Sequence, residues 1–213
     1  METDGRPAEI ILEAVERFGE GRLALAASWQ KETAVLVDLV RRHAPGARIF
    51  TLDTGELFPE TYATWRAVEE RYGITVESYR GEWVPGMWAT EPDRCCFLRK
   101  VEPLERALAD ADCWISGVRR DQSPERAETE ELGWDARHGL WKANPLATWT
   151  DRDVWAYIAE HELPYNPLHD QGYDSIGCTH CTLKGAGRAG RWAGRDKSEC
   201  GINVPAAPVT RAA

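Results

Sequence analysis

The sequence predicts an α/β fold in which a mainly parallel, twisted sheet is covered by helices on both faces. Short apolar runs that are typical of buried strands alternate with longer segments of helical periodicity along most of the chain. Strand–helix alternation of this kind produces β-α-β units, whose successive strands run parallel. With 213 residues, of which 43% are hydrophobic, the chain is long enough to bury the core of one such domain.

The first helices and strand are indicated close to the amino terminus. Residues 7–18 carry apolar side chains at helical spacing, and Gly19 follows as a stop signal. Residues 22–27, RLALAA, are typical of a short buried strand. A polar loop then leads to a second helix over residues 33–42, whose apolar side chains again recur at helical spacing.

The next stretch repeats the strand–helix pattern. Residues 47–52, ARIFTL, are the second expected strand, and a polar turn separates them from a helix over residues 59–72. Pro59 suits the first turn of that helix, because a proline there loses no helical hydrogen bond. Gly73 ends the helix, and residues 74–79, ITVESY, are expected to form a third strand.

The second half of the chain contains fewer regular elements. The pattern predicts one helix and two further strands, over residues 95–109, 112–118 and 140–146. Residues 119–137 are polar and are expected to be loop. Thr150 is suited to cap a helix over residues 151–160, because its hydroxyl can accept from amides of the first turn. Beyond Pro164 the chain is rich in Gly and Arg and is expected to be mostly loop.

Charge and composition exclude several classes of function. The net charge of −9 argues against general nucleic-acid binding, which needs a basic surface, although a local anion site remains compatible with it. No apolar run approaches the roughly 18 residues of a membrane span. The start of the chain, METDGRPAEI, is acidic and lacks an apolar core, so we expect no secretory signal and a cytoplasmic location. Disulfides are not expected in that compartment.

Three polar segments follow predicted strands, at residues 28–32, 53–56 and 118–123. Ligands of parallel sheets bind outside the carboxyl ends of the strands, so we expect these segments to form a site. Ser28 suits an anionic group through its hydroxyl and the amides at a helix start, and the alternative is a plain helix cap. Asp53 suits a ribose hydroxyl, and the alternative is an ordinary Asx turn.

Arg119 lies in the third of these segments, within the run GVRRDQSPER. A guanidinium group suits sulfate or phosphate because it donates paired hydrogen bonds. The alternative is a solvated, charged loop without a ligand.

Four of the six cysteines fall in two close pairs, Cys95 with Cys96 and Cys178 with Cys181. Adjacent cysteines are poor disulfide partners, because their Cα atoms lie too close for an unstrained bridge. Four thiolates suit zinc or an iron–sulfur cluster, and the Arg and Lys side chains beside the first pair would offset their charge. The alternative is that these thiols are buried and bind nothing. Cys113 lies inside a predicted strand and is expected to be a core residue.

Cys200 lies in a Gly-rich segment near the carboxyl terminus. Arg195 and Lys197 would lower the pKa of its thiol and make it nucleophilic, whereas Glu199 would raise that pKa. The alternative is a cysteine without a function.

Six motifs taken together resemble a known family. They are LDTGELFPET, PDRCCFLRKVEPL, GVRRDQSPER, IGCTHCT, RAGRW and ECGI. In this order they resemble the assimilatory sulfonucleotide reductases, which comprise the adenylylsulfate (APS) and phosphoadenylylsulfate (PAPS) reductases. The resemblance runs from Arg22 to Asn203 and so covers nearly the whole chain.

The resemblance implies an adenine nucleotide alpha-hydrolase-like fold, in which the turn at Ser28 is a modified PP-loop. It implies one 4Fe–4S cluster, bound by Cys95, Cys96, Cys178 and Cys181. Lys100 would lie between this cluster and the substrate sulfate. Further substrate contacts would come from Arg188, Arg191 and Arg119. Cys200 would be the catalytic nucleophile.

The activity that the resemblance implies is thioredoxin-dependent reduction of APS to sulfite and AMP in assimilatory sulfate reduction. Cys200 would attack the sulfur of APS to form an S-sulfocysteine, from which thioredoxin or a similar dithiol releases sulfite. APS is favoured over PAPS because members with both cysteine pairs mostly use APS. Residues 1–186 would form the nucleotide-binding and iron–sulfur domain, and residues 187–213 a mobile segment that carries Cys200. A homo-oligomer is left open.

Asn203 departs from the family pattern, which usually has His at this position. An amide cannot exchange a proton near neutral pH, so any acid–base role of that His is lost or moved. Three alternatives remain: a PAPS reductase of the same mechanism, an ATP pyrophosphatase on the same fold, and a non-catalytic metal module that senses redox state. The second would prefer a Ser-Gly-Gly-rich loop, which SWQKE lacks, and the third would not need Cys200.

Overall fold

The computed structural model describes residues 4–195, 197 and 199–203, and at its centre is a six-stranded sheet. The strand order is β3-β2-β1-β4-β6-β5. All neighbouring strands pair in parallel except β5 and β6, which are antiparallel at one edge. The strands are β1 (Leu23–Ala27), β2 (Arg48–Leu52), β3 (Glu77–Tyr79), β4 (Cys113–Ile115), β5 (Leu132–Asp135) and β6 (Leu140–Ala143). The predicted mainly parallel α/β sheet is thereby confirmed.

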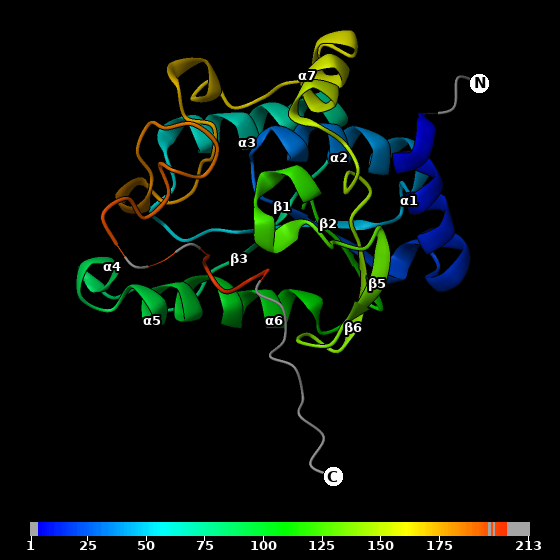
Figure 1. Cartoon of the computed structure of the whole chain (residues 1–213). Helices are drawn as coiled ribbons and strands as arrows, with labels where there is room; N and C mark the ends of the chain where they lie inside the picture. Colours follow the sequence, from blue (N-terminus) through cyan, green and yellow to red (C-terminus); the bar gives the residue numbers. More distant parts are fainter. Residues whose placement is uncertain (1–3, 196, 198, 204–213) are drawn as a thin grey trace.

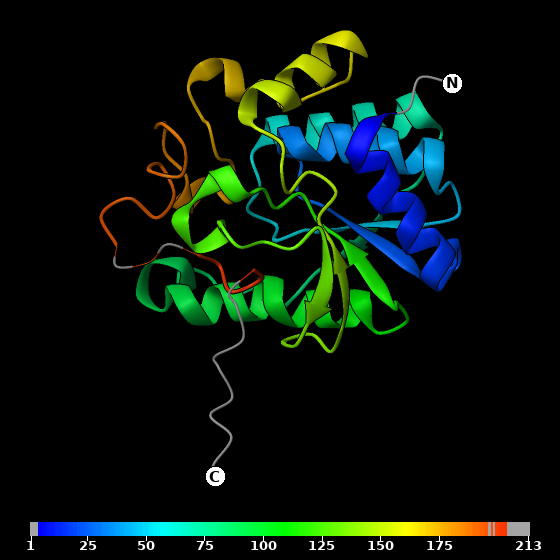
Figure 2. The same ribbon diagram turned by 45° about the vertical axis from the view of Figure 1, so that its right-hand side comes forward.

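Helices cover both faces of the sheet (Figure 1). The helices of one face are α1 (Gly5–Phe18), α2 (Lys31–His43), α3 (Pro59–Tyr72) and α7 (Asp151–Glu160). The helices of the other are α4 (Met87–Thr90), α5 (Pro92–Cys96) and α6 (Glu102–Leu108), which Figure 2 shows in one row below the sheet. Short 3-10 turns occur at η1 (Glu20–Arg22), η3 (Arg120–Gln122), η4 (Pro124–Arg126), η5 (His169–Gln171) and η6 (Thr179–Cys181). Among the described residues, no helix is long and apolar enough to cross a membrane.

The two faces of the sheet belong to separate apolar cores. Successive residues of a strand point to opposite faces, so Leu25 and Ile115 pack with α1, α2, α3 and α7. Their neighbours Ala24 and Trp114 join Phe50 in a second core with α6. Because both faces of the central strands are buried, these strands are nearly continuous apolar runs rather than alternating ones.

The first cysteine pair lies on a continuous helical segment. The helix predicted over residues 95–109 begins earlier, at Pro92, and contains a π-helical turn, η2 (Phe97–Val101), between α5 and α6. In this turn the Glu102 amide donates to the Phe97 carbonyl, five residues back. Pro103 explains the wider turn, because it has no amide to donate and its ring crowds the carbonyl four residues earlier. Such turns recur at functional sites.

The strand β5 was not predicted, because residues 119–137 were expected to be loop. It lies at the sheet edge and pairs with β6 across a turn closed by the Gly139 amide, which donates to the Asp135 carbonyl at 2.8 Å. Gly139 has a φ of 70°, which only glycine adopts without strain. Trp134 on this strand is 56% exposed, so the apolar alternation that marks a half-buried strand is missing.

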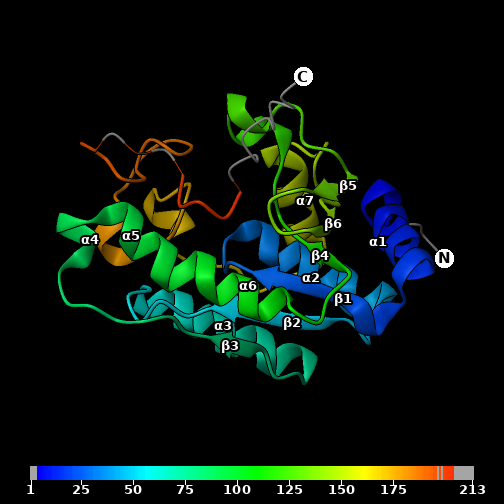
Figure 3. The same ribbon diagram turned by 90° about the horizontal axis from the view of Figure 1, so that it is seen from below.

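The last described residues return to the middle of the molecule. Figures 1, 2 and 3 all show the red carboxyl-terminal segment lying alongside α6, on the side of the sheet that carries the second core. Ile202 packs against that core. The segment therefore closes over the carboxyl ends of the central strands.

Candidate active site

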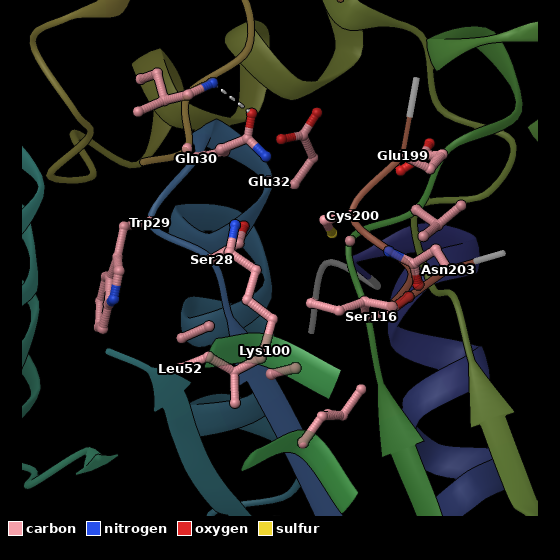
Figure 4. Close-up of a pocket in the computed structure, with 18 of the residues that line it drawn as sticks. Ser28, Trp29, Gln30, Glu32, Leu52, Lys100, Ser116, Glu199, Cys200 and Asn203 are labelled. Atoms are coloured by element: carbon pink, nitrogen blue, oxygen red, sulfur yellow. Dashed lines mark hydrogen bonds between the residues drawn. The ribbon is translucent and has the colours of Figure 1, made fainter. Parts of the chain in front are cut away.

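A cavity of about 160 Å³ lies at the carboxyl ends of β1, β2 and β4 (Figure 4). Its wall includes the turn after β1, the ends of the strands, Lys100 from η2 and the carboxyl-terminal segment Glu199–Asn203. Strand order places β1 between β2 and β4, so side chains that are far apart in the sequence meet here. This is the edge of the sheet at which ligands of such folds bind.

The turn at Ser28 forms a rigid part of the cavity wall. The backbone amides of Ser28 and Trp29 donate to Thr33 Oγ1 at 3.0 and 3.1 Å. Trp29 has a φ of 62°, a conformation that is costly for a large side chain. Its indole Nε1 donates to Thr51 Oγ1 at 2.8 Å, and its ring stacks on Trp65 with 5.4 Å between centroids. These contacts hold the strained turn and keep Ser28 at the cavity.

One part of the cavity is apolar. Its lining comes from β2, α6 and β4 and consists of Phe50, Leu52, Leu104 and Trp114. Phe50 and Trp114 are 0% and 1% exposed, because the second core holds them. A rigid wall of aromatic and aliphatic side chains suits a planar base.

Four cationic side chains also line the cavity, namely Lys100, Arg126, Arg188 and Arg191, together with the carboxylates of Glu32 and Glu199. Burial acts to lower the pKa of Lys100, but the neighbouring thiols Cys178 and Cys200 outweigh it, so the pKa is raised and the amine stays charged. Arg191 Nη1 donates to Ser175 Oγ at 3.2 Å, while its buried Nε has no hydrogen-bond partner in the described part of the chain. That donor remains available to an anionic ligand.

Cys200 lies in the wall of the same cavity, in the segment whose side chains Figure 4 shows across from Ser28 and Lys100. Its thiol is close enough to Lys100 to raise the pKa of the amine. A thiol, a group of fixed cations and an apolar wall therefore surround one space. Such an arrangement can bind a nucleotide with an anionic tail and present a nucleophile to that tail.

A second, smaller cavity adjoins the first. All four paired cysteines line it: Cys95, Cys96, Cys178 and Cys181. The first pair ends α5. In the second pair, Cys178 precedes η6 and Cys181 is its last residue, and the Thr179 amide of this turn donates to the Glu56 carbonyl at 2.8 Å. Lys100 and Trp192 line both cavities, so the two spaces share a wall.

The four thiols form a donor set that suits a metal centre. All are free of disulfides, although no three His, Cys, Asp or Glu side chains within the described residues already stand in an ion-binding arrangement. Burial raises the pKa of Cys96 to about 11 and also raises the pKa of Cys95 and Cys181. Burial opposes ionisation of Cys178 as well, but Lys100 and the Thr54 hydroxyl lower its pKa overall. A bound cation would stabilise all four thiolates.

Asp53, predicted to contact substrate, is not among the side chains that line the first cavity. Its carboxylate is 2% exposed and accepts from the Gly55 amide at 2.9 Å, the Tyr62 hydroxyl at 2.7 Å and Arg80 Nε at 2.9 Å. Burial acts to raise the pKa of Asp53, but these three partners lower it overall. Asp53 thus holds the turn after β2, and a substrate contact stays a prediction.

Arg119 likewise does not line this cavity. Its guanidinium donates to Glu32 and to Asp151, each at 3.0 Å, and to Asp121 at 2.6 Å. Three carboxylates compensate this buried cation. Arg119 ties α2 to α7, and its role in substrate binding also stays a prediction.

Arg126 and Trp114 line the cavity but were not named as site residues by sequence reasoning. The three arginines of the run that holds Arg119 and Arg126 were together expected to suit sulfate or phosphate, but only Arg119 was assigned to the substrate. Trp114 was seen only as part of an apolar strand, and its place on the face that meets α6 needed the sheet topology.

Comparison with known proteins relates the whole chain to one group of enzymes. A family profile described as phosphoadenosine phosphosulfate reductase domain matches residues 22–184. The adenosine 5'-phosphosulfate reductase of Salinibacter ruber is 43% identical over 212 residues, covering 93% of this chain and 84% of that relative. The phosphoadenosine 5'-phosphosulfate reductase of Gloeobacter violaceus is also 43% identical, with coverage of 94% and 90%.

Solved structures show the same relationship. The phosphoadenylyl-sulfate reductase of Candida auris, in a phosphate complex, has a TM-score of 0.75 and 30% identity, covering 84% of this chain and 91% of that one. The FMN adenylyltransferase of Candida glabrata has a TM-score of 0.65 at 14% identity, covering 86% and 68%. The second likeness concerns the fold alone.

Proposed function

The chain belongs to the phosphoadenosine phosphosulfate reductase family, and on that premise we propose that it reduces APS to sulfite and AMP in sulfate assimilation. The observation that carries this proposal is the position of Cys200, whose thiol lines one cavity together with Lys100, Arg188 and Arg191. Relatives named as reductases of APS or of PAPS match more than nine-tenths of the chain and support the reaction class.

In the proposed complex the adenine lies against the apolar wall and the phosphosulfate against the cations. The unpaired Nε of Arg191 and the charged amine of Lys100 would bind oxygens of the phosphosulfate. Arg188 would bind a further oxygen, as its place in the cavity wall allows. These charges offset the repulsion between a thiolate and an anionic substrate.

The first chemical step transfers the sulfonate group to the enzyme. The Cys200 thiolate attacks the sulfur of APS, and a Cys–sulfur bond forms as the bond from that sulfur to the phosphate oxygen breaks. AMP leaves with the electron pair of the broken bond. The phosphate leaves unchanged as part of AMP. The product on the enzyme is an S-sulfocysteine at position 200.

The second step needs a dithiol, for which we propose thioredoxin or a similar protein. One of its thiolates attacks Sγ of Cys200, and sulfite leaves with the electron pair of the sulfur–sulfur bond. The second thiol of the partner then attacks the mixed disulfide and returns Cys200 as a thiol. The two electrons come from the dithiol, which ends as a disulfide.

We also propose that Cys95, Cys96, Cys178 and Cys181 bind one 4Fe–4S cluster, a cofactor suited to four unpaired thiols around one cavity. Such a cluster would supply negative charge beside Lys100. The amine of Lys100 reaches both cavities and would itself stay protonated and bind the substrate sulfate.

The preference for APS over PAPS and the cellular location are parts of the same proposal. Family members that keep both cysteine pairs mostly use APS, and this chain has both. Six free thiols suit the reducing conditions of the cytoplasm, where thioredoxin also acts.

The test is an intact-mass measurement on anaerobically purified protein incubated with APS, or with PAPS, without reductant. We expect one added sulfonate group with APS, mapped to Cys200 by peptide analysis. Cys200→Ser should still bind APS but gain no mass, whereas the matched control Cys113→Ser, in the core strand β4, should gain it. An adduct on another residue would contradict the assignment of the nucleophile, and an adduct with PAPS alone would contradict the substrate.

A further inference from the structure

The segment that carries Cys200 is anchored on both sides of the cysteine. On the amino side, Glu199 Oε1 accepts from Arg126 Nη2 at 2.7 Å and from Nε at 3.2 Å, while Glu199 Oε2 pairs with Arg188 at 2.9 Å. On the carboxyl side, Asn203 Oδ1 accepts from Lys142 Nζ at 2.8 Å. Cys200 is therefore held between two polar anchors, with Glu199, Cys200 and Asn203 all at the cavity (Figure 4).

The first anchor is fixed by the body of the protein. Arg126 ends the short turn η4 and is only 9% exposed. Its Nη1 also donates to Gln122 Oε1, and Gln122 Nε2 donates in turn to Glu32 Oε1 at 3.1 Å. These hydrogen bonds hold the Arg126 guanidinium in place independently of Glu199. Little conformational freedom is therefore lost when Arg126 pairs with Glu199.

The second anchor, Lys142, is part of the sheet. Lys142 lies on β6 beside Trp114 of β4, and its Nζ is 4.2 Å from the centroid of the Trp114 ring. Burial lowers the pKa of this amine to about 8, against the opposing effect of Asp135. Within the described residues Lys142 forms no ion pair within 4.0 Å, so its hydrogen bond to Asn203 is its main polar contact.

Asn203 acts here as an acceptor, which needs no exchange of a proton. The amide of Asn203 cannot take part in acid–base chemistry near neutral pH. The contact with Lys142 shows a different contribution, because it orients the backbone three residues after the nucleophile. Ile202, packed against the second core, adds an apolar contact between the two anchors.

We propose that Arg126 and Lys142 are positioning residues, which hold Glu199 and Asn203 and thereby place the Cys200 thiol in line with the sulfur of the substrate. This inference rests on the proposed role of Cys200 as the nucleophile. Reacting atoms must approach to about 3–3.5 Å in alignment, so a loosened segment slows the transfer while the apolar wall and Lys100, which lie outside the segment, stay in place. Lys142 does not line the cavity, and Arg126, which does, already donates to Glu199.

The experiment compares Arg126→Met and Lys142→Met with Arg66→Met, a control on the exposed face of α3. For each protein the Kd for APS is measured without reductant, and the rate of Cys200 sulfonation is followed in a single turnover by quenched-flow mass analysis. We expect sulfonation to slow by about tenfold to a hundredfold in the two variants, because each loses a charged hydrogen bond. The Kd for APS should stay within about threefold of the parent value in Lys142→Met, whose side chain does not line the cavity.

A second measurement does not depend on turnover. Alkylation of Cys200 by iodoacetamide without substrate should become faster in Arg126→Met and Lys142→Met but not in Arg66→Met, because the segment is then released. Arg126→Lys should recover part of the sulfonation rate, since it restores a charged donor to Glu199. Should Lys142→Met fold poorly, Asn203→Ala breaks the same contact from the carboxyl-terminal segment and is expected to slow sulfonation equally.

The outcomes separate this inference from the proposed function. If the parent protein forms no adduct at Cys200 with APS or PAPS, the proposed function fails. If the parent protein is sulfonated and the variants match it in rate and in alkylation, the function stands and the positioning role is wrong. A loss of APS affinity as large as the loss of rate would also overturn the inference, because Arg126 or Lys142 would then bind substrate.

Discussion

Replacement of Asp53 distinguishes a structural role of its carboxylate from the ribose contact that its position after a strand suggested. Asp53→Ala removes an acceptor that holds the Gly55 amide, the Tyr62 hydroxyl and Arg80. In the structure the carboxylate does not line the cavity that holds Cys200. We therefore expect the variant to lose stability and to keep its affinity for APS.

The size of the effect follows from the three contacts. Hydrogen bonds to a charged group contribute about 1.5–3 kcal/mol each when they are buried, which applies to the bonds from Gly55 and Tyr62. The side chain of Arg80 is 69% exposed, so its ion pair adds only about 0–1 kcal/mol. We expect the free energy of unfolding to fall by about 3–7 kcal/mol. For a domain of this size, that loss lowers Tm by about 7–16 °C.

Thermal unfolding monitored by circular dichroism measures the change, and calorimetric titration with APS measures the affinity. Asp53→Asn serves as a matched control, because its amide oxygen can still accept from Gly55 and about half of the loss should be recovered. An unchanged Tm together with a weakening of APS binding by about tenfold, or 1.4 kcal/mol, would refute the structural role and restore the ribose contact.

The same carboxylate makes stability depend on pH. The partners of Asp53 lower its pKa below the ordinary 3.8, so its contribution is fully present above that value and is lost as the pH falls through the folded-state pKa. The difference in stability between the parent protein and Asp53→Asn should therefore shrink in acid, and a difference that grows below pH 3.8 would contradict this sign.

Three further predictions concern the two cavities and the second core. Lys100→Met should slow Cys200 sulfonation by about 10²–10³-fold, since it removes a fixed cation from the reacting anion, and an unchanged rate would exclude that role. Cys178→Ser should lower the iron bound per chain in anaerobically purified protein, relative to the control Cys113→Ser, and equal iron contents would contradict the ligand set. Leu104→Ala should lower the free energy of unfolding by about 2–5 kcal/mol in urea titrations, because Leu104 is 0% exposed, and a loss below about 1 kcal/mol would mean that the second core collapses to fill the space.

The sheet could be predicted because its central strands are apolar on both faces. Leu25 and Ala24 meet different cores, so the strand LALAA has no polar residue. The edge strand β5 lacks this signal, since Trp134 is largely exposed and the pairing with β6 is what makes the segment extended. Edge strands depend on a partner that local periodicity does not reveal.

For the site, the sequence identified residue types and strand ends but not the direction of each side chain. Ser28, Lys100, Arg188, Arg191 and Cys200 line one cavity, and their roles there stay predictions. Arg119 lies in the expected segment, yet it turns toward Glu32 and Asp151. Whether an arginine faces a ligand or a carboxylate is decided by tertiary contacts, because both partners suit a guanidinium equally well.

Lys100 and Trp192 line both cavities, so ligands bound in the two cavities would be thermodynamically linked. A cluster on one side and a sulfonucleotide on the other would meet the same two side chains. By reciprocity, any gain in substrate affinity that the cluster produces equals the gain in cluster affinity that the substrate produces. In a cell short of iron, the protein without its cluster would then bind APS less tightly. In a cell rich in APS, bound substrate would stabilise the cluster.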